Sequence, residues 1–186
     1  MRGLPDQWRD GYRGGPTMTS VRILPWSEDD FGLLRRVNVP EMKEHLGGPE
    51  TEEQVRVRHA RYLRPDEIGG RMYRIVADGE AAGTVGFWSR VWRDEPVYES
   101  GWSVLPEFQG RGVAVAAVRE VLGAARDHGR RRHLHAFPSV DHHASNGVCR
   151  KAGFILLGEC DFEYPPGRLL RSNDWRFDLE AASRRP

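Results

Sequence analysis

The segment covering residues 104–114 constrains the fold more than any other part of the chain. Its sequence, VLPEFQGRGVA, follows a run typical of a β-strand and precedes a long helical pattern. The proline ends the strand because it offers no N–H to a sheet ladder, and Gly110 and Gly112 allow a tight turn into the helix. The first turn of a helix has unpaired N–H groups and a partial positive charge, which stabilise an anion by about 0.3–1 kcal/mol. The segment therefore predicts an anion site, with phosphate as its natural ligand and Gln109 and Arg111 as further donors.

Length, charge and cysteine content restrict the class of protein. A chain of 186 residues fits one domain and is long enough to bury a core without disulfides or metal. The formal net charge is +1, so no overall field directs the chain toward nucleic acid or acidic membranes. Cys149 and Cys160 come without a secretory leader, and no apolar run approaches the roughly 18 residues of a membrane span. These features predict a cytoplasmic protein with no membrane or nucleic-acid partner.

The chain is expected to form one domain with short polar ends. Residues 1–19 are rich in Gly, Arg, Pro and Asp and lack a periodic apolar pattern, so we expect a flexible N-terminal extension. The domain itself covers residues 20–180, and residues 181–186 form a polar, frayed tail.

Periodicity and turn residues predict an α/β fold of the α+β type. The N-terminal third is mostly helical, with Ser27 and the capping box of Thr51 as helix starts. An Asp78-Gly79 pair suggests a hairpin turn between two later strands. The expected strands are 21–24, 72–77, 82–92, 97–105, 133–137, 154–163 and 170–179, and the expected helices are 27–36, 40–47, 51–63, 112–128 and 141–152. This order predicts a mixed, mostly antiparallel sheet of about seven strands flanked by helices.

Two motifs together resemble the GNAT superfamily of acyl-CoA-dependent N-acyltransferases. The V-x-P-x-x-Q-x-x-G-x-A pattern of residues 104–114 is similar to motif A of that superfamily. The sequence ASNGVCRKAGF at residues 144–154 is similar to its downstream helix. The resemblance covers residues 21–180 and is closest to the branch that acetylates ribosomal-protein N-termini, because the E-x-G-W-x-V pattern at residues 99–104 also has a counterpart there.

The resemblance implies a coenzyme site in the sheet, with acetyl-CoA as co-substrate and no metal. In such proteins the strands equivalent to residues 97–105 and 133–137 splay apart at one end, and the pantetheine arm lies in the gap. The backbone of Trp102, Ser103 and Val104 is then expected to pair with this arm. The pyrophosphate is expected at the turn and the first helical residues, which are Gln109, Gly110, Arg111, Gly112, Val113, Ala114 and Val115.

Two further residues are expected near the pantetheine arm. His142 stands where the superfamily has an asparagine that contacts pantetheine, and an imidazole can also donate a hydrogen bond. Ser145 lies near the same end of the arm, although capping of the helix explains a serine there equally well.

Glu99 is the candidate general base. Attack on a thioester requires a neutral amine, and at pH 7 deprotonation costs roughly 4.6 kcal/mol for a lysine but about 1.4 kcal/mol for an α-amine. Some relatives place a glutamate where this chain has Phe137, so another carboxylate is needed. Glu99 lies on the strand that leads to the expected thioester, where it can take the proton or order a water that carries it. A cross-strand ion pair is the alternative role for a carboxylate on a strand.

Cys149 is the candidate acid for the leaving group. It stands where many members of the superfamily have a tyrosine that protonates the departing thiolate. A thiol with an ordinary pKa of about 8.5 can serve in this role. The alternative is a small core residue on a helix that faces the sheet.

Two other site types match the chain poorly. His133, His135, His142 and His143 fit no standard metal-ligand spacing, so no metal is expected. A dinucleotide-binding fingerprint requires a third glycine or an alanine where this chain has Val115.

The acceptor and the alternatives to catalysis stay open at the level of sequence. A small-molecule amine and a peptide or protein N-terminus are both compatible with the motifs. A non-catalytic acyl-CoA sensor is the alternative function, because Phe137 and Cys149 replace residues that relatives use in catalysis. Formation of a homodimer through an edge strand is also left open.

Overall fold

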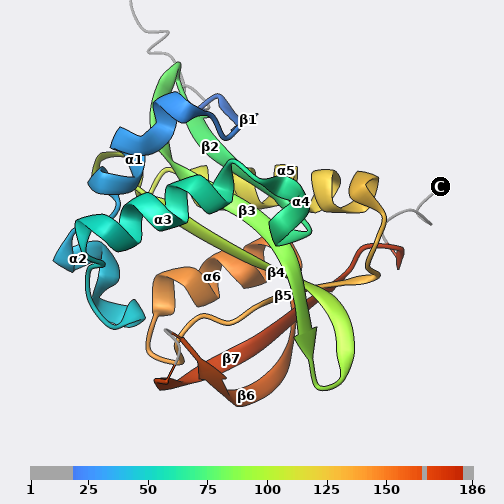
Figure 1. The fold of residues 1–186 in the computed structure, drawn as a ribbon. Coiled ribbons are helices and arrows are strands. Elements are labelled where there is room, and N and C mark those ends of the chain that lie inside the picture. The colour runs from blue at the N-terminus through green and yellow to red at the C-terminus, as the bar shows by residue number, and fades with distance from the viewer. Residues whose placement is uncertain (1–18, 165–166, 182–186) are drawn as a thin grey trace, which may run out of the picture.

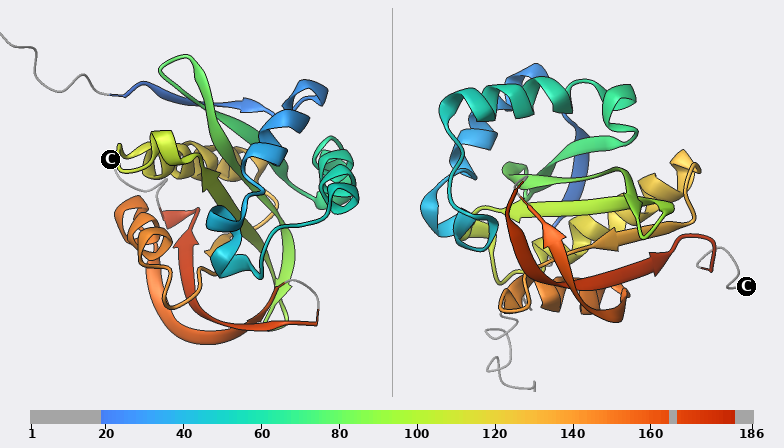
Figure 2. Two further views of the ribbon diagram at one scale, coloured as in Figure 1. Left: turned by 90° about the vertical axis from the view of Figure 1, so that its left-hand side faces the viewer. Right: turned by 60° about the horizontal axis from the view of Figure 1, so that its bottom comes forward.

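The computed structural model describes residues 19–164 and 167–181. Of the expected extension (1–19) and the expected tail (181–186), residues 1–18 and 182–186 lie outside the described residues. The described chain forms one seven-stranded sheet in the order β1-β2-β3-β4-β5-β7-β6, with helices on both faces (Figures 1 and 2). No helix in this part of the chain is both long and apolar enough to cross a membrane.

The N-terminal elements supply the edge strand β1 and the helices that cover one face of the sheet. They are β1 (Val21–Pro25), a 3-10 turn (Glu28–Asp30), α1 (Phe31–Arg36), α2 (Pro40–Lys43), a second 3-10 turn (Glu44–Leu46), α3 (Glu52–Tyr62) and α4 (Pro65–Ile68). Helix α3 begins at the predicted capping box, in which Gln54 N donates to Thr51 Oγ1 at 3.3 Å and Thr51 N donates to Gln54 Oε1 at 2.8 Å. Helix α4 was not expected from the sequence, and it is a single turn that begins at Pro65 and ends at Gly69 with φ +57°.

The next three strands form an antiparallel meander. They are β2 (Arg71–Ala77), β3 (Glu80–Trp92) and β4 (Glu95–Val104). The predicted turn between β2 and β3 has positive φ at both central residues, +51° at Asp78 and +91° at Gly79. This conformation matches the right-handed twist of the flanking strands.

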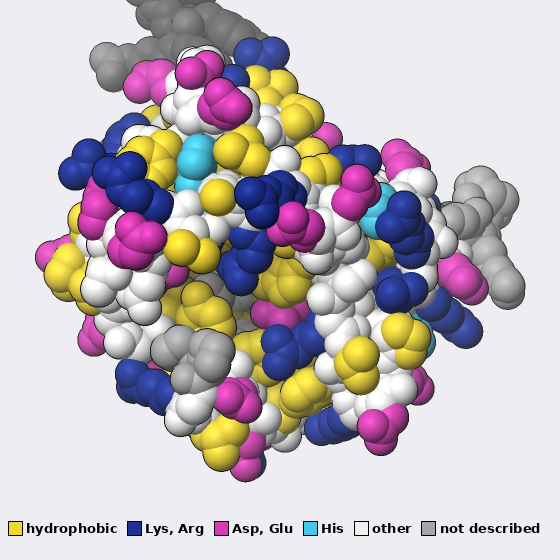
Figure 3. All heavy atoms as spheres, viewed as in Figure 1, with side chains coloured by type: hydrophobic (Ala, Val, Ile, Leu, Met, Phe, Trp, Pro, Cys, Tyr) yellow, Lys and Arg dark blue, Asp and Glu magenta, His cyan; other side chains and the backbone are white. Residues whose placement is uncertain are grey.

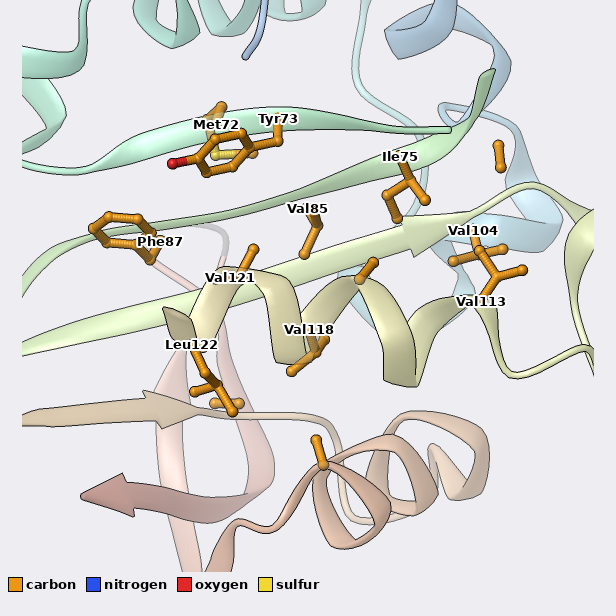
Figure 4. Packing of buried hydrophobic residues seen from close by; sticks show 14 of the residues in the cluster. Met72, Tyr73, Ile75, Val85, Phe87, Val104, Val113, Val118, Val121 and Leu122 are labelled. Atoms are coloured by element: carbon orange, nitrogen blue, oxygen red, sulfur yellow. The ribbon is translucent and has the colours of Figure 1, made fainter. Parts of the chain in front are cut away.

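Helix α5 (Val113–His128) supplies the centre of the core. It lies across β1, β3 and β4, and its buried side chains face those of the sheet (Figure 4). Val118 and Val121 are fully buried together with Ile75 and Val85 of the sheet. Burial of each such side chain contributes about 1.5–3 kcal/mol, so this contact fixes the position of the helix.

The C-terminal elements complete the sheet and add the helix that packs beside α5 on one of its faces. They are β5 (His133–Ala136), α6 (His143–Ala152), β6 (Ile155–Glu163) and β7 (Leu169–Asp178), and β7 lies between β5 and β6. Helices α5 and α6 lie side by side on one face of the sheet, and α1–α4 lie on the other (Figure 2).

The parallel pair β4 and β5 is short. In the described chain these strands pair at two positions, Tyr98 with Leu134 and Glu99 with His135. Beyond Glu99 the strand β4 continues for five residues paired with β3 alone. The predicted splay between these strands is therefore confirmed, and its closed end lies at Glu99 and His135.

Candidate active site

The gap between β4 and β5 has an unpaired strand edge along one side. Among the described residues, none of β5 pairs with residues 100–104. Trp102 and Ser103 are half-buried, whereas Val104 is buried. Apart from the Val104 carbonyl, which accepts from Gln109 Nε2, this edge has no strand partner among the described residues, and such an edge favours an extended ligand that adds as a strand. The three residues expected to contact such a ligand thus lie on the correct edge.

The loop after β4 leads directly into α5. A 3-10 turn (Pro106–Phe108) is followed by Gly110 with φ +73° and Gly112 with φ +78°. An added Cβ at either glycine would meet no described atom within 4 Å. The loop therefore presents the N-terminus of a sixteen-residue helix to open space, as an anion site requires.

Two side chains of this loop hold its conformation. Gln109 Nε2 donates to the Val104 carbonyl at 2.8 Å. The Arg111 guanidinium pairs with Asp78 in the β2–β3 turn and lies over the Phe108 ring. Both residues were expected to offer their side chains to the anion, but the structure uses these side chains to fasten the loop to the sheet. That Gln109 and Arg111 bind the anion stays a prediction, which their backbone amides can also fulfil.

Asn146 organises the opposite side of the gap. Its Oδ1 accepts from Trp175 Nε1 and from Asn173 Nδ2, both at 2.8 Å. Its Nδ2 donates to the carbonyl of Ser139 at 2.9 Å and to that of His142 at 3.0 Å. Asn146 thus ties α6, the loop before it and β7 together. Sequence reasoning assigned it no role, although its spacing to Cys149 and Ala152 places a polar residue on the buried face of a helix.

His142 and Ser145 lie at the start of α6, as expected. The His142 ring stacks on the His45 ring with centroids 4.2 Å apart, and His45 Nδ1 lies 3.3 Å from Asp141 Oδ1. Burial, followed by the nearby His45, holds the pKa of His142 below its ordinary value. Ser145 is half-buried. The stacking connects the α2–α3 segment to the loop before α6.

Glu99 lies on the sheet face covered by the N-terminal helices. Its side chain is nearly buried, and Arg90 Nη1 of β3 donates to its Oε2 at 2.7 Å. Burial raises the pKa of Glu99, and the neighbouring Arg90 opposes this rise. The cross-strand ion pair considered as an alternative role is present. A carboxylate with a raised pKa is also suited to proton transfer, so the pair and a catalytic role are compatible.

The same face carries a cluster of aromatic side chains. The Phe137 ring stacks on Phe162 at 4.4 Å, Trp92 lies 4.6 Å from Phe137, and the Arg90 guanidinium lies 4.3 Å above Phe162. Figure 3 shows that the molecule is hollowed between α3 and the β6–β7 hairpin, where hydrophobic, acidic and basic side chains meet. We call this region the acceptor hollow. The Phe87 ring of β3 is not part of this aromatic cluster, because it is buried in the core beneath α5.

Cys149 is fully buried and belongs to the hydrophobic core. Burial raises the pKa of its thiol to about 12. A thiol with so high a pKa is a weak proton donor, and its role as an acid stays a prediction. We expect Cys149→Ala to lower the free energy of unfolding by about 1–2 kcal/mol with less than a twofold change in kcat. Denaturant unfolding and initial rates on the same sample check this, and a large loss of kcat in a stable variant would instead identify an acid.

The histidines do not form a metal centre in the described chain. Among residues 19–164 and 167–181, no group of three or more His, Cys, Asp or Glu side chains has the geometry to hold a metal ion.

Comparison with known proteins connects this geometry to a family. The family model described as "Acetyltransferase (GNAT) domain" matches residues 20–155. A comparison with curated protein sequences gives no significant match.

Several solved structures share the fold. RimL, a ribosomal L7/L12 α-N-protein acetyltransferase in complex with coenzyme A, aligns with a TM-score of 0.71 and 21% identity over 89% of this chain and 98% of that chain. The aminoglycoside acetyltransferase AAC(6')-Ib in complex with coenzyme A gives 0.72 and 18%, with coverage of 89% and 98%. An acetyltransferase from Salmonella typhimurium that modifies the N-terminal serine of L7/L12 gives 0.69 and 20%, with coverage of 87% and 96%. At these identities the likeness is one of fold.

Proposed function

The chain belongs to the GNAT acetyltransferase family, and on that basis we propose that it transfers the acetyl group of acetyl-CoA directly to a primary amine. The observation that carries the proposal is the gap between β4 and β5, which leads to an open helix N-terminus. A strand-like arm and a diphosphate are needed to fill these two features, and coenzyme A has both. No metal and no covalent acyl-enzyme is required.

We place the coenzyme along β4 and the start of α5. The pantetheine arm pairs with the backbone of Trp102, Ser103 and Val104 at the open strand edge. The pyrophosphate lies against the amides of residues 109–115. His142 and Ser145 face the arm from the start of α6. The thioester then lies near the closed end of the gap, because the arm runs back along β4 from the pyrophosphate.

The acceptor amine enters from the acceptor hollow. Its nitrogen attacks the thioester carbonyl, and backbone N–H groups of the gap polarise the carbonyl oxygen. Glu99, anchored by Arg90, binds the incoming ammonium group and orders the water that carries its proton away. The thiolate leaves toward α6. The motif offers Cys149 there as a proton donor, but burial raises the pKa of its thiol to about 12, so a proton of the amine nitrogen is the better source.

The acceptor class is an amine on a small molecule or at a protein N-terminus. The structural neighbours named above include acetyltransferases of both kinds. An α-amine is easier to deprotonate at pH 7 than a lysine by about 3 kcal/mol, so a chain without a dedicated glutamate at Phe137 suits an α-amine. We place the reaction in the cytoplasm, and both cysteines of the chain are free and buried.

Replacement of Glu99 tests its role. We expect Glu99→Gln to lower kcat about tenfold below pH 7 and less at pH 9, because the amine increasingly loses its proton unaided at high pH. Burial raises the pKa of Glu99, so at still lower pH, where the wild-type carboxylate takes up a proton, the difference in kcat between wild type and variant is expected to shrink again. Steady-state rates from pH 6 to 9 check the prediction. Glu80→Gln, an exposed residue of the neighbouring strand β3, is the matched control, and a pH profile of Glu99→Gln parallel to that of the wild type would remove Glu99 from the mechanism.

The proposed activity is tested by release of free CoA thiol from acetyl-CoA in the presence of a panel of amines. The panel contains peptides with free α-amines, lysine-containing peptides, aminoglycosides and polyamines. A non-catalytic acyl-CoA sensor is the second candidate, favoured by the buried Cys149 and by the phenyl ring of Phe137 in the acceptor hollow. Tight binding of acetyl-CoA without thiol release on any amine would support the sensor and contradict the enzyme.

A further inference from the structure

A buried histidine and aspartate form a hydrogen-bonded pair on the face of the acceptor hollow. His135 Nδ1 and Asp174 Oδ1 lie 2.6 Å apart, and Trp92 Nε1 donates to the other carboxylate oxygen at 2.9 Å. His135 is 4% exposed and Asp174 1% exposed. The two residues are 39 positions apart in the chain and belong to adjacent strands, β5 and β7. A buried pair of this kind holds one imidazole in one orientation.

The register of the sheet places His135 at the closed end of the gap. His135 and Glu99 are Cα partners, and they form the last pair before β4 and β5 separate. Side chains of directly paired residues in a sheet point to the same face. The His135 ring also stacks on Phe137, at 5.8 Å and 18°, which joins it to the aromatic cluster of the acceptor hollow. His135 therefore lies at the closed end of the gap and beside the aromatic cluster, next to the position that the proposed function gives to the thioester.

The pair fixes which imidazole nitrogen is free. Burial alone raises the pKa of Asp174, but the hydrogen bonds from His135 and Trp92 outweigh this and hold the pKa below its ordinary value. An ionised carboxylate can only accept hydrogen bonds, so His135 Nδ1 carries the proton and donates it to Asp174. The lone pair of Nε2 is then available. The ring lines a pocket together with Trp92, Arg93, Glu95, Leu157, Asp174 and Arg176.

We propose that His135 is the general base of the acetyl transfer and that Asp174 is its positioning residue. The proposal rests on the proposed function and identifies the group that finally receives the proton. The water ordered by Glu99 passes one proton of the ammonium group to His135 Nε2. The amine nitrogen then forms a bond to the thioester carbon, the C–S bond breaks, and its electron pair stays on sulfur. A second proton of the nitrogen goes to this thiolate, so an ammonium ion and acetyl-CoA give the amide, CoA thiol and one proton, which His135 releases to solvent.

Charged groups on every neighbouring element face this pair. On β4, Glu99 lies in its ion pair with Arg90. At the β3–β4 turn, Arg93 lies 4.0 Å from Asp174. On β7, Arg176 is the register partner of His135, and on β5 itself the His133 ring lies 6.4 Å from the His135 ring. Among these groups the three arginines outnumber the one carboxylate, Glu99. The pH dependence is therefore tested against His133→Gln, a variant that leaves these arginines in place.

The test compares the pH profiles of kcat/KM for wild type, His135→Gln, Asp174→Asn and the control His133→Gln. We expect the wild-type profile to fall toward acid pH as one proton binds to the free enzyme. For His135→Gln we expect kcat/KM to be about 100-fold lower at pH 7, and the profile to lack this fall toward acid pH, the acid limb. For Asp174→Asn we expect kcat/KM to be at least tenfold lower, mostly through kcat, because an asparagine side chain also allows the His135 tautomer with the proton on Nε2. His133→Gln, on the same strand and the same face, is expected to stay within twofold of the wild type.

Two further measurements separate this role from a structural one. The dissociation constant of acetyl-CoA is expected to change less than threefold in all four proteins, so that a loss of rate is a loss of chemistry. In the NMR spectrum of wild-type protein labelled with nitrogen-15 at histidine, the His135 ring is expected as the Nδ1–H tautomer. The Asp174→Asn variant is expected to lose this tautomer. An active wild type together with a His135→Gln variant that keeps the acid limb would overturn the proposal while leaving the acetyltransferase function intact. Detection of the Nε2–H tautomer at His135 would overturn it without any substitution.

Discussion

Gly112→Asp is expected to weaken acetyl-CoA binding on the order of 1,000-fold while the protein stays folded. Gly112 precedes the first turn of α5, and a side chain added there points into the open space that the pyrophosphate occupies in the proposed complex. A carboxylate about 4 Å from one negative charge costs about 4 kcal/mol at the effective dielectric constant of a protein surface. At 1.4 kcal/mol per tenfold change, this gives the expected loss. The same carboxylate is favourable to the helix N-terminus itself, so the loss of binding does not require loss of structure.

Two matched variants isolate the charge effect of this substitution. Gly123→Asp introduces the same charge in the middle of α5, where an added Cβ also meets no described atom within 4 Å, and is expected to leave the dissociation constant unchanged. Gly112→Ala brings only a methyl group and the backbone strain of φ +78°, about 1–2 kcal/mol, which lowers the free energy of unfolding, and is expected to leave the dissociation constant within about threefold of the wild type. Isothermal titration calorimetry with acetyl-CoA and thermal unfolding of the same samples check both quantities. Wild-type affinity in a folded Gly112→Asp variant would rule out the helix N-terminus as the pyrophosphate site.

Local signals in the sequence were sufficient for most of the elements. The capping box at Thr51 and the turn at Asp78-Gly79 each specify a backbone conformation through groups within four residues. Gly129 and Gly153 end α5 and α6 with φ values of +67° and +98°, which only glycine adopts without strain. Such signals need no tertiary context, so the predicted boundaries agree with the structure to within a few residues.

The order of strands required information that the sequence does not carry locally. Strand β7 lies between β5 and β6, so the last strand in the chain separates its predecessor from the centre of the sheet. The short pairing of β4 with β5 also depends on contacts between segments more than 30 residues apart. The splay was expected only because the motifs resemble a superfamily in which it occurs.

The binding half of the site was more predictable than the chemical half. The glycines at 110 and 112 act through backbone conformation, which the residue type reveals directly. Gln109 and Arg111 show the limit of this reasoning, because residue type alone does not distinguish a side chain that binds an anion from one that fastens the loop. The pair of His135 and Asp174 joins two strands, and its aspartate gave no signal in the sequence. Histidines on the β5 strand drew attention only as metal ligands, which the described residues do not support.

Asn146 shows why one polar residue in a helix can matter as much as a core residue. All four of its side-chain hydrogen bonds connect elements that border the gap: the loop before α6, α6 itself and β7. The carbonyls of Ser139 and His142 each accept a second, backbone hydrogen bond, from His142 N and Asn146 N. Trp175 Nε1 is different, because it is buried and donates its hydrogen bond to Asn146 Oδ1.

Asn146→Ala is therefore expected to lower the free energy of unfolding by about 3 kcal/mol. An unsatisfied buried donor at Trp175 costs about 1–3 kcal/mol, and each further hydrogen bond lost costs about 0.5–1.5 kcal/mol. For a domain of this size the change corresponds to a fall in Tm of roughly 6–12 °C. Calorimetric unfolding gives both quantities. Asn173→Ala is the control, since it removes a single partner of Asn146 and leaves the Trp175 hydrogen bond in place, and it is expected to cost about 1 kcal/mol. Equal losses in the two variants would show that the buried indole N–H, and with it the anchoring of β7 to α6, contributes nothing to stability.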